Sequence, residues 1–238
     1  AIMSMGLDDL KPFNPREKVI EYLLEDAEKK QKLIDLTVKE FADETSRESP
    51  APGGGTISAY MGALGAALGT MVANLSSHKA GWDARWEEFS NWANKGQAIQ
   101  SELMVLVDED TKAFNRIMSA FGLPKESAEE KTARSMAIQE ATLFATEVPL
   151  HTMQASYKVF ELCRAMAEEG NPNSVSDAGV GVLAARAAVL GAGLNVKINA
   201  SGLKDKQKAE QLVSEANILI NKANEAEKEI MKIVETKL

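Results

Sequence analysis

The chain has 238 residues and a formal net charge of -8, with 45% hydrophobic and 26% charged residues. A chain of this length can bury a large core, and the composition is that of a folded globular protein. Its acidic balance repels the phosphate backbone, so we expect no nucleic-acid partner. The one cysteine, Cys163, excludes an internal disulfide and favours a cytoplasmic location. No Cys/His cluster has zinc-ligand spacing, so we expect no metal.

Strong helix formers dominate the long segments, which are built from Ala, Leu, Met, Glu and Lys. Only 5% of the residues are aromatic, and no Asn-Gly or Asp-Gly pair separates two alternating apolar runs as in a β-hairpin. The sequence therefore predicts an all-α fold, a multi-helix bundle. In chain order the expected helices span about 15–26, 33–49, the uncharged run that ends at 76, 85–122, 131–168, 178–200 and 205–237.

A charged connector, DAEKKQK, separates the first expected helix from the rest of the chain. We therefore divide the sequence into an N-terminal appendage, residues 1–32, and a helical domain, residues 33–238. The segments considered for binding and catalysis all lie in the helical domain.

Two central helices are expected to be rich in glycine and alanine. The first, within residues 50–76, carries no charge, which also fits a membrane span, but Ser58, Thr70 and Asn74 interrupt its apolar surface. We expect a helix buried on nearly all sides, and no membrane partner. Small residues recur at helical spacing in both helices and predict a close-packed pair, within one chain or across a dimer interface: Gly62, Ala66, Gly69 and Ala73 in the first, Gly181, Ala184, Ala188 and Gly191 in the second.

A glycine triplet, Gly53, Gly54 and Gly55, stands at the start of the first of these helices. Exposed backbone N–H groups and the positive end of the helix dipole can hold an anion or a carbonyl oxygen there. The lysine of a nucleotide-binding P-loop is missing from the loop. The alternative is a tight turn in which Thr56 serves as the N-cap.

The most informative ionisable residue is Asp110, in the segment LMVLVDEDTKAF. On a helix it shares a face with Leu106, Val107 and Ala113, so it interrupts an apolar stripe. Desolvation among apolar side chains raises the pKa of a carboxyl group, which suits a general base that works near neutral pH. The alternative is a buried aspartate paired with a polar group for structure alone.

Three further polar residues lie on or near the second small-residue helix. Asp177 is at its start, where aspartate is common as a capping residue. Asn195 and Asn199 are four residues apart and therefore on one face. Their amides either form interhelical hydrogen bonds or recognise a ring that carries donors and acceptors.

Five short motifs occur in one order along the chain: SPAPGGGT, MVANL, LVDED, NPNSVSD and LNVKIN. Together they resemble the cyclodeaminase domain of formiminotransferase-cyclodeaminase and the related methenyltetrahydrofolate cyclohydrolases. The resemblance covers residues 33 to about 235. The N-terminal appendage resembles the tail that follows the transferase domain in the bifunctional enzymes.

This resemblance implies a mostly helical homodimer that converts 5-formimidoyltetrahydrofolate to 5,10-methenyltetrahydrofolate and ammonia, in histidine breakdown and one-carbon supply. It implies no cofactor beyond the folate substrate, and a formiminotransferase as partner or fused domain. Two alternatives remain open. One is a methenyltetrahydrofolate cyclohydrolase, and the other is a non-catalytic helical partner of a formiminotransferase.

The resemblance also implies roles for particular residues. The second aspartate of LVDED, Asp110, is the implied proton acceptor, and the helical-face argument selects the same residue. The residues implied to hold the pterin or fix the geometry of the site are Gly53, Gly54, Gly55, Asp177, Asn195 and Asn199. The candidates for the glutamate tail of a polyglutamylated folate are Lys197, Lys204 and Lys206.

Overall fold

The computed structural model describes residues 32–49 and 51–238, which divide into two units, one ending at Phe41 and the other running from Ala42 to Leu238. The helix expected at 15–26 lies outside the described residues, as does nearly all of the predicted N-terminal appendage, residues 1–32. Within the described part of the chain every regular element is helical, and this confirms the all-α prediction.

The helix expected at 33–49 is shorter than the sequence pattern indicates. A 3₁₀ turn, η2, spans Leu33–Asp35, and α3 begins afresh at Val38 and runs over Val38–Thr45. The reason is a capping box: Glu40 N donates to Thr37 Oγ1 at 3.2 Å, and Thr37 N donates to Glu40 Oε2 at 2.9 Å. This reciprocal pair fixes a new helix start inside the expected helix.

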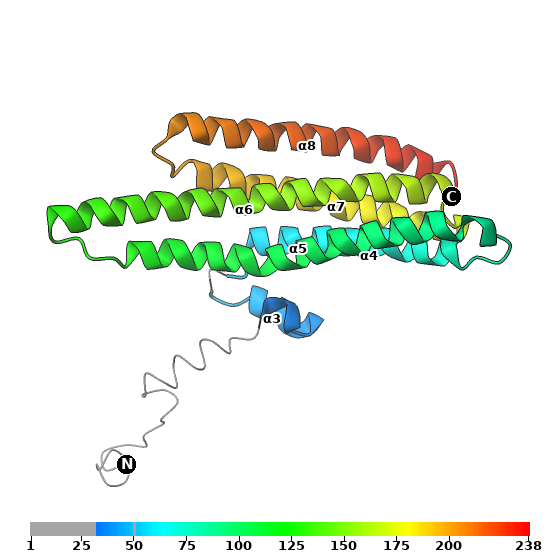
Figure 1. Ribbon diagram of the computed structural model, residues 1–238, viewed down its shortest axis with the longest axis horizontal. Helices are drawn as coiled ribbons and strands as arrows, with labels where there is room; N and C mark the ends of the chain where they lie inside the picture. The colour runs from blue at the N-terminus through cyan, green and yellow to red at the C-terminus, as the bar shows by residue number, and fades with distance from the viewer. Residues whose placement is uncertain (1–31, 50) are drawn as a thin grey trace, which may run out of the picture. The chain divides into compact units, whose positions relative to one another are not determined.

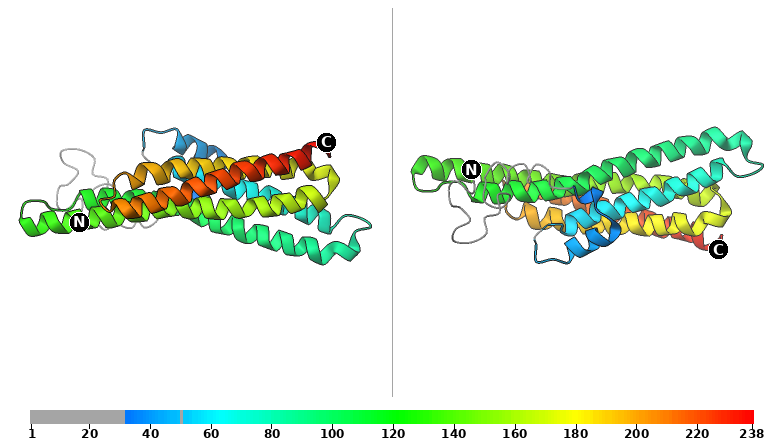
Figure 2. Two further views of the ribbon diagram at one scale, coloured as in Figure 1. Left: turned by 90° about the horizontal axis from the view of Figure 1, so that it is seen from above. Right: turned by 90° about the horizontal axis from the view of Figure 1, so that it is seen from below.

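Five long helices form the second unit (Figure 1). They are α4 Gly54–Ser77, α5 Trp86–Phe121, α6 Ala128–Glu169, α7 Val175–Ala200 and α8 Lys206–Glu235, with short 3₁₀ turns η3 Asp83–Arg85 and η4 Pro172–Ser174. Helices α4 and α7 lie side by side against α5 and α6, and α8 packs on α6 and α7. Figure 2 shows the hairpin of α5 and α6 projecting beyond the other helices at one end.

The contact between α4 and α7 brings the two backbones together. A Cβ on Gly65 would lie 2.8 Å from the carbonyl oxygen of Gly181, and a Cβ on Gly181 would lie 3.1 Å from the carbonyl oxygen of Gly65. Gly54 lies beside Asn195 at the other end of the contact, so the two helices are antiparallel. The small residues of α4 and α7 therefore form a seam at which the two backbones touch. Of the two alternatives that the sequence left open, the pair within one chain is the one observed.

Two helical segments, Gly54–Ser77 and Pro172–Ala200, are long and apolar enough to cross a membrane by length and composition. A core helix passes the same test, and 61% and 50% of their most apolar windows are buried inside the bundle. Both helices therefore serve as core helices of this unit, and each keeps a face that the other helices of the unit leave exposed.

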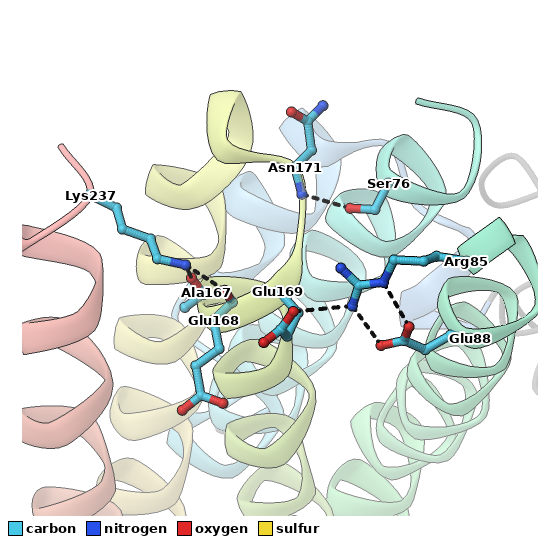
Figure 3. A network of polar contacts seen from close by, with 8 residues as sticks. All are labelled: Ser76, Arg85, Glu88, Ala167, Glu168, Glu169, Asn171 and Lys237. Atoms are coloured by element: carbon cyan, nitrogen blue, oxygen red, sulfur yellow. Dashed lines mark hydrogen bonds and ion pairs between the residues drawn. The ribbon is translucent and has the colours of Figure 1, made fainter. Parts of the chain in front are cut away.

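The end of the bundle at which α4 and α6 finish is held by a polar network, shown in Figure 3. Asn171 N donates to Ser76 Oγ at 2.8 Å and joins the end of α4 to the loop after α6. Arg85 pairs with Glu88 at 2.9 Å and with Glu169 at 3.1 Å. Exposed ion pairs of this kind add little stability. Their effect is to fix the positions of the helix ends relative to one another.

Candidate functional site

Asp110 of α5 lies against the first turn of α4. Its Oδ2 accepts two hydrogen bonds from one residue, Thr56, from the backbone N at 2.8 Å and from the side-chain Oγ1 at 2.8 Å. The neighbours Leu106, Val107 and Ala113 on the same face of α5 are buried, as the helical spacing predicts, and Asp110 itself is half-buried. The other carboxylate oxygen, Oδ1, has no hydrogen-bond partner among the described residues and stays available to a ligand.

The glycine triplet and Thr56 form the helix start that holds this carboxylate. Gly53 is the N-cap residue of α4, and Thr56 lies three residues into the helix. The alternative reading of Thr56 as the N-cap is therefore wrong, because its hydroxyl instead accepts from Gly53 N at 3.4 Å and donates to Asp110. A Cβ on Gly55 would overlap Asp110 Oδ1 and lie 2.7 Å from Cγ, so only glycine leaves the carboxylate in its observed position.

Two opposing effects set the pKa of Asp110. Burial raises the pKa of the carboxyl group, because a desolvated carboxylate is unfavourable. The two hydrogen bonds from Thr56 lower it, because they stabilise the charged form. Burial is the larger effect, and the pKa lies above the ordinary aspartate value. A carboxylate with a raised pKa and a free oxygen has the properties of a general base.

The amide of Asn195 completes the same end of the seam. Its Nδ2 would lie 3.5 Å from a Cβ on Gly54, and it donates to the carbonyl oxygen of Gly191 at 3.0 Å. One turn further along α7, Asn199 Nδ2 donates to the carbonyl oxygen of Ala145 in α6 at 2.6 Å. The structure thus brings Asp110, the glycine triplet and Asn195 together, whereas the amide of Asn199 is used in an interhelical contact.

Asp177 lies elsewhere in the chain. It is in the first turn of α7, eighteen residues before Asn195, which corresponds to about 27 Å at 1.5 Å per residue. One chain therefore does not bring Asp177 to the end of α4 where Asp110 lies. Its part in a binding site stays a prediction.

Two of the three lysines selected for a glutamate tail share one groove. Lys197 and Lys206 line a groove of about 570 Å³ between the end of α7 and α8, together with Asn217 and Asn221. Lys204 instead donates from Nζ to Ser135 Oγ at 2.5 Å. Among the residues that the structure describes, no group of three His, Cys, Asp or Glu side chains could hold a metal ion.

Sequence reasoning missed the main role of Thr56. It treated the threonine as a cap for its own helix, whereas both of its donors point across to α5. The contact joins residues 54 positions apart, and no local pattern reports such a distance. The sequence does offer one indication, a glycine triplet followed directly by a hydroxyl residue. Such a helix start has space for a side chain from another helix and a hydroxyl group that can bond it.

Fold and site together define an all-α bundle that holds a desolvated carboxylate against a glycine-rich helix start. The family model described as "Formiminotransferase-cyclodeaminase" matches residues 37–218, and the chain belongs to that family.

Named relatives fall into two groups. The chain is 39% identical over 202 residues to the methenyltetrahydrofolate cyclohydrolase of Methylorubrum extorquens, and the match covers 85% of this chain and 97% of that protein. It is 35% identical over 213 residues to the formimidoyltransferase-cyclodeaminase of Rattus norvegicus, covering 88% of this chain but only 39% of the rat protein. The crystal structure of formiminotetrahydrofolate cyclodeaminase from Thermotoga maritima matches with a TM-score of 0.75 and 25% identity, over 84% of this chain and 96% of that one.

Proposed function

We propose that this chain forms or opens the one-carbon bridge of 5,10-methenyltetrahydrofolate, with Asp110 as the group that carries the proton. The observation that supports this most directly is the geometry of the carboxylate. Thr56 holds Oδ2 from two directions, which leaves Oδ1 as the basic atom. The names of the relatives supply the substrate class, because they are folate-processing enzymes.

The first candidate reaction is cyclodeamination of 5-formimidoyltetrahydrofolate. Nitrogen 10 attacks the formimidoyl carbon on nitrogen 5, a new carbon–nitrogen bond closes a five-membered ring, and the exocyclic carbon–nitrogen bond breaks to release ammonia. Asp110 takes the proton of nitrogen 10 and returns it to the departing amine. The formimidoyl nitrogen enters the reaction protonated, so the transferred proton completes ammonia and the positive charge stays on the methenyl bridge. Both reacting nitrogens are in one molecule, and a site that holds the ring-closing conformer supplies much of the rate enhancement.

The second candidate is hydrolysis of 5,10-methenyltetrahydrofolate, in which water replaces the amine at the same carbon. It is favoured by the 39% identity to the Methylorubrum cyclohydrolase over nearly the whole of that protein. In this reaction Asp110 takes a proton from the attacking water, and the oxygen bonds to the bridge carbon. One carbon–nitrogen bond of the bridge then breaks, the released nitrogen takes up the proton, and a formyl group remains on the other nitrogen. The same carboxylate serves both reactions, because ammonia and water are alternative nucleophiles at one electrophilic carbon.

The start of α4 and the amide of Asn195 are proposed to bind the folate. The N–H groups of Gly54 and Gly55 belong to the first turn, where a helix has no internal acceptor for them. The side-chain Oδ1 of Asn195 lies beside them and accepts no hydrogen bond from the described residues, whereas Nδ2 bonds within α7. Donors and an acceptor around Asp110 match a pterin ring, which presents both. No cofactor beyond the folate takes part in the proposed reaction.

The proposal includes a homodimer in the cytoplasm and, as the rat relative is a fusion of which this chain spans 39%, a formiminotransferase as partner or fused domain. The uncovered face of α4 and α7 supports the dimer. The exposed large side chains on it are apolar: Leu64, Met71, Leu75, Val180, Leu183, Leu194 and Ile198. An apolar patch of this extent on a folded domain marks an interaction surface.

One assay tests the activity and separates the two reactions. The purified chain is mixed with 5-formimidoyltetrahydrofolate, and ammonia release and methenyl absorbance are followed together. Both signals rise if the chain is a cyclodeaminase. No ammonia, with hydrolysis of added 5,10-methenyltetrahydrofolate, identifies the cyclohydrolase. Inactivity on both folates rejects the proposed function and leaves the non-catalytic partner role.

A further inference from the structure

Pro149 is buried in the interior of α6, at the level of the candidate site. Helices α4 and α6 run in the same direction, since both finish at the polar network of Figure 3. Along them Gly62 lies directly against Ser156. Seven residues before Gly62 is Gly55, and seven residues before Ser156 is Pro149. Seven residues make nearly two helical turns, so Pro149 lies on the face of α6 that is turned to α4, level with Gly55.

The proline leaves one carbonyl group of α6 without its usual donor. In an α-helix the carbonyl oxygen of Ala145 would accept from the N–H of residue 149, and Pro149 has no N–H. Ala145 is buried, and a buried carbonyl without a donor costs about as much free energy as a lost hydrogen bond. Asn199 of α7 supplies the donor, because its Nδ2 lies 2.6 Å from this oxygen. The proline in α6 thus provides the acceptor that α7 uses.

The Asn199 bond holds a part of α7 that α4 does not reach. Helix α4 begins at Gly54, which lies beside Asn195, so the last turn of α7 extends past the start of α4. The support for this turn comes from α6, where Asn199 bonds Ala145. Gln139 of α6 also holds the loop that follows, through two hydrogen bonds of 3.2 Å and 2.7 Å. The position of Asn195 therefore depends on α6 as well as on the seam with α4.

We propose that Pro149 and Asn199 form a pair of positioning residues for the folate site. Pro149 provides the free carbonyl group, and Asn199 uses it to fix the end of α7 that carries Asn195. Asn199 then acts on the substrate only through Asn195 and touches no folate atom itself. Asp110 is held separately, by the first turn of α4, so the pair affects substrate binding rather than proton transfer. This role rests on the proposed function, whereas the bond and its dependence on the proline do not.

Melting temperatures test the bond without any activity. Asn199→Ala leaves the buried carbonyl of Ala145 without a donor, and should lower the melting temperature by about 4 °C or more. In a Pro149→Ala background residue 149 has its own N–H, so the same replacement should cost less than about 2 °C. Because Asn199→Ala is compared within each background, the effects of replacing the proline itself cancel. An equal loss in both backgrounds would overturn the dependence on the proline.

Two further variants serve as controls for the melting temperatures. Pro149→Val also restores an N–H and fills the volume of the proline ring, so the comparison holds if the cavity left by alanine unfolds the protein. Asn94→Ala removes an exposed asparagine of α5 whose side chain has no hydrogen bond within the described part of the chain. It should not lower the melting temperature, because alanine is the better helix former. A loss as large as that of Asn199→Ala would overturn the assigned bond.

Steady-state kinetics test the positioning role, with whichever of the two folates the wild type turns over. Asn199→Ala should raise KM at least about fivefold and leave kcat within about twofold of the wild type, because it displaces a binding residue and not the proton carrier. A replacement that only destabilises the fold gives the opposite pattern, a lower kcat at an unchanged KM, since the folded fraction alone is active. That pattern would overturn the role.

A second background decides whether Asn199 acts through Asn195. In an Asn195→Ala protein, Asn199→Ala should raise KM less than about twofold further, because the residue through which it acts is already gone. Losses that multiply would show that Asn199 contacts the folate itself, and would overturn the proposal. A wild type inactive on both folates would reject the proposed function and the positioning role with it. The melting temperatures would still decide whether Pro149 provides the acceptor for Asn199.

Discussion

Replacing Gly55 with alanine tests the position of the Asp110 carboxylate through a residue that has no functional group. The added Cβ would overlap Asp110 Oδ1 and lie 2.9 Å from Oδ2. The carboxyl group is the end of a flexible side chain, so the helix start remains and the carboxylate turns away from Thr56. Gly122→Ala, at the end of α5, is the matched control, because its Cβ would lie 3.4 Å from the carbonyl oxygen of Ser119, an ordinary contact, and Gly122 takes no part in the proposed site.

The size of the effect follows from the role of the displaced group. A positioned general base contributes about 10²- to 10⁴-fold to the rate. We therefore expect Gly55→Ala to lower kcat/KM at least about 100-fold, which corresponds to about 2.7 kcal/mol of transition-state stabilisation. Gly122→Ala should stay within about threefold of the wild type, because it moves no group at the reacting atoms.

The assay follows methenyl absorbance with either folate substrate, and circular dichroism confirms that both variants are folded. A folded Gly55→Ala protein with near-normal kcat/KM would show that the carboxylate need not remain where the structure places it. In that case the general-base role of Asp110 is wrong. An equal loss in Gly122→Ala would instead indicate a general effect of an added methyl group on the protein rather than displacement of the carboxylate.

Three further predictions concern pH, stability and packing. Thr56→Val removes a hydrogen bond that lowers the pKa of Asp110, so the acid limb of kcat/KM against pH should move to higher pH, while Thr56→Ser should leave it in place. Asp110→Asn should abolish turnover yet raise the melting temperature at pH 7, because the raised pKa of Asp110 makes its ionised carboxylate unfavourable in the folded state. This gain in melting temperature should vanish below about pH 3.9, where the carboxyl group is protonated in both the folded and the unfolded state. A gain that persists at low pH would contradict the assignment. Gly65→Ala should cost about 1–3 kcal/mol in urea unfolding, since its Cβ meets the backbone oxygen of Gly181, and a neutral result would refute the description of the seam.

The fold class could be predicted from the sequence because the features that indicate helices are local and recur along the chain. Helix-forming composition and the missing hairpin turns predict the all-α class, and the expected ends of α5 and α7 agree with the structure within a few residues. The segment from Leu33 was read as one helix because the reciprocal bonds of Thr37 and Glu40 depend on a cap that periodicity does not report. The sequence also could not decide whether the two small-residue helices pair within one chain or across a dimer interface, because small residues permit close approach but do not specify which helix packs against them.

The site was only partly readable. Asp110 stood out because a carboxylate on an apolar stripe is conspicuous at helical spacing. Thr56 did not, because its acceptor lies 54 residues away. Asn199 and Asn195 look equivalent in sequence, and only the packing of α6 shows that Asn199 donates to Ala145.

The seam of α4 and α7 has a consequence for positional accuracy. Glycine and alanine have no side-chain rotamers, so where these residues line the seam the two helices cannot adjust by repacking side chains. The start of α4 and the amide of Asn195 are thus joined through main-chain contacts such as that between Gly65 and Gly181. Ring closure between two atoms of one substrate demands placement to a fraction of an ångström. The glycine and alanine residues of the seam have no side-chain torsions to fix, so the helices can be placed accurately without the entropy cost of ordering larger side chains.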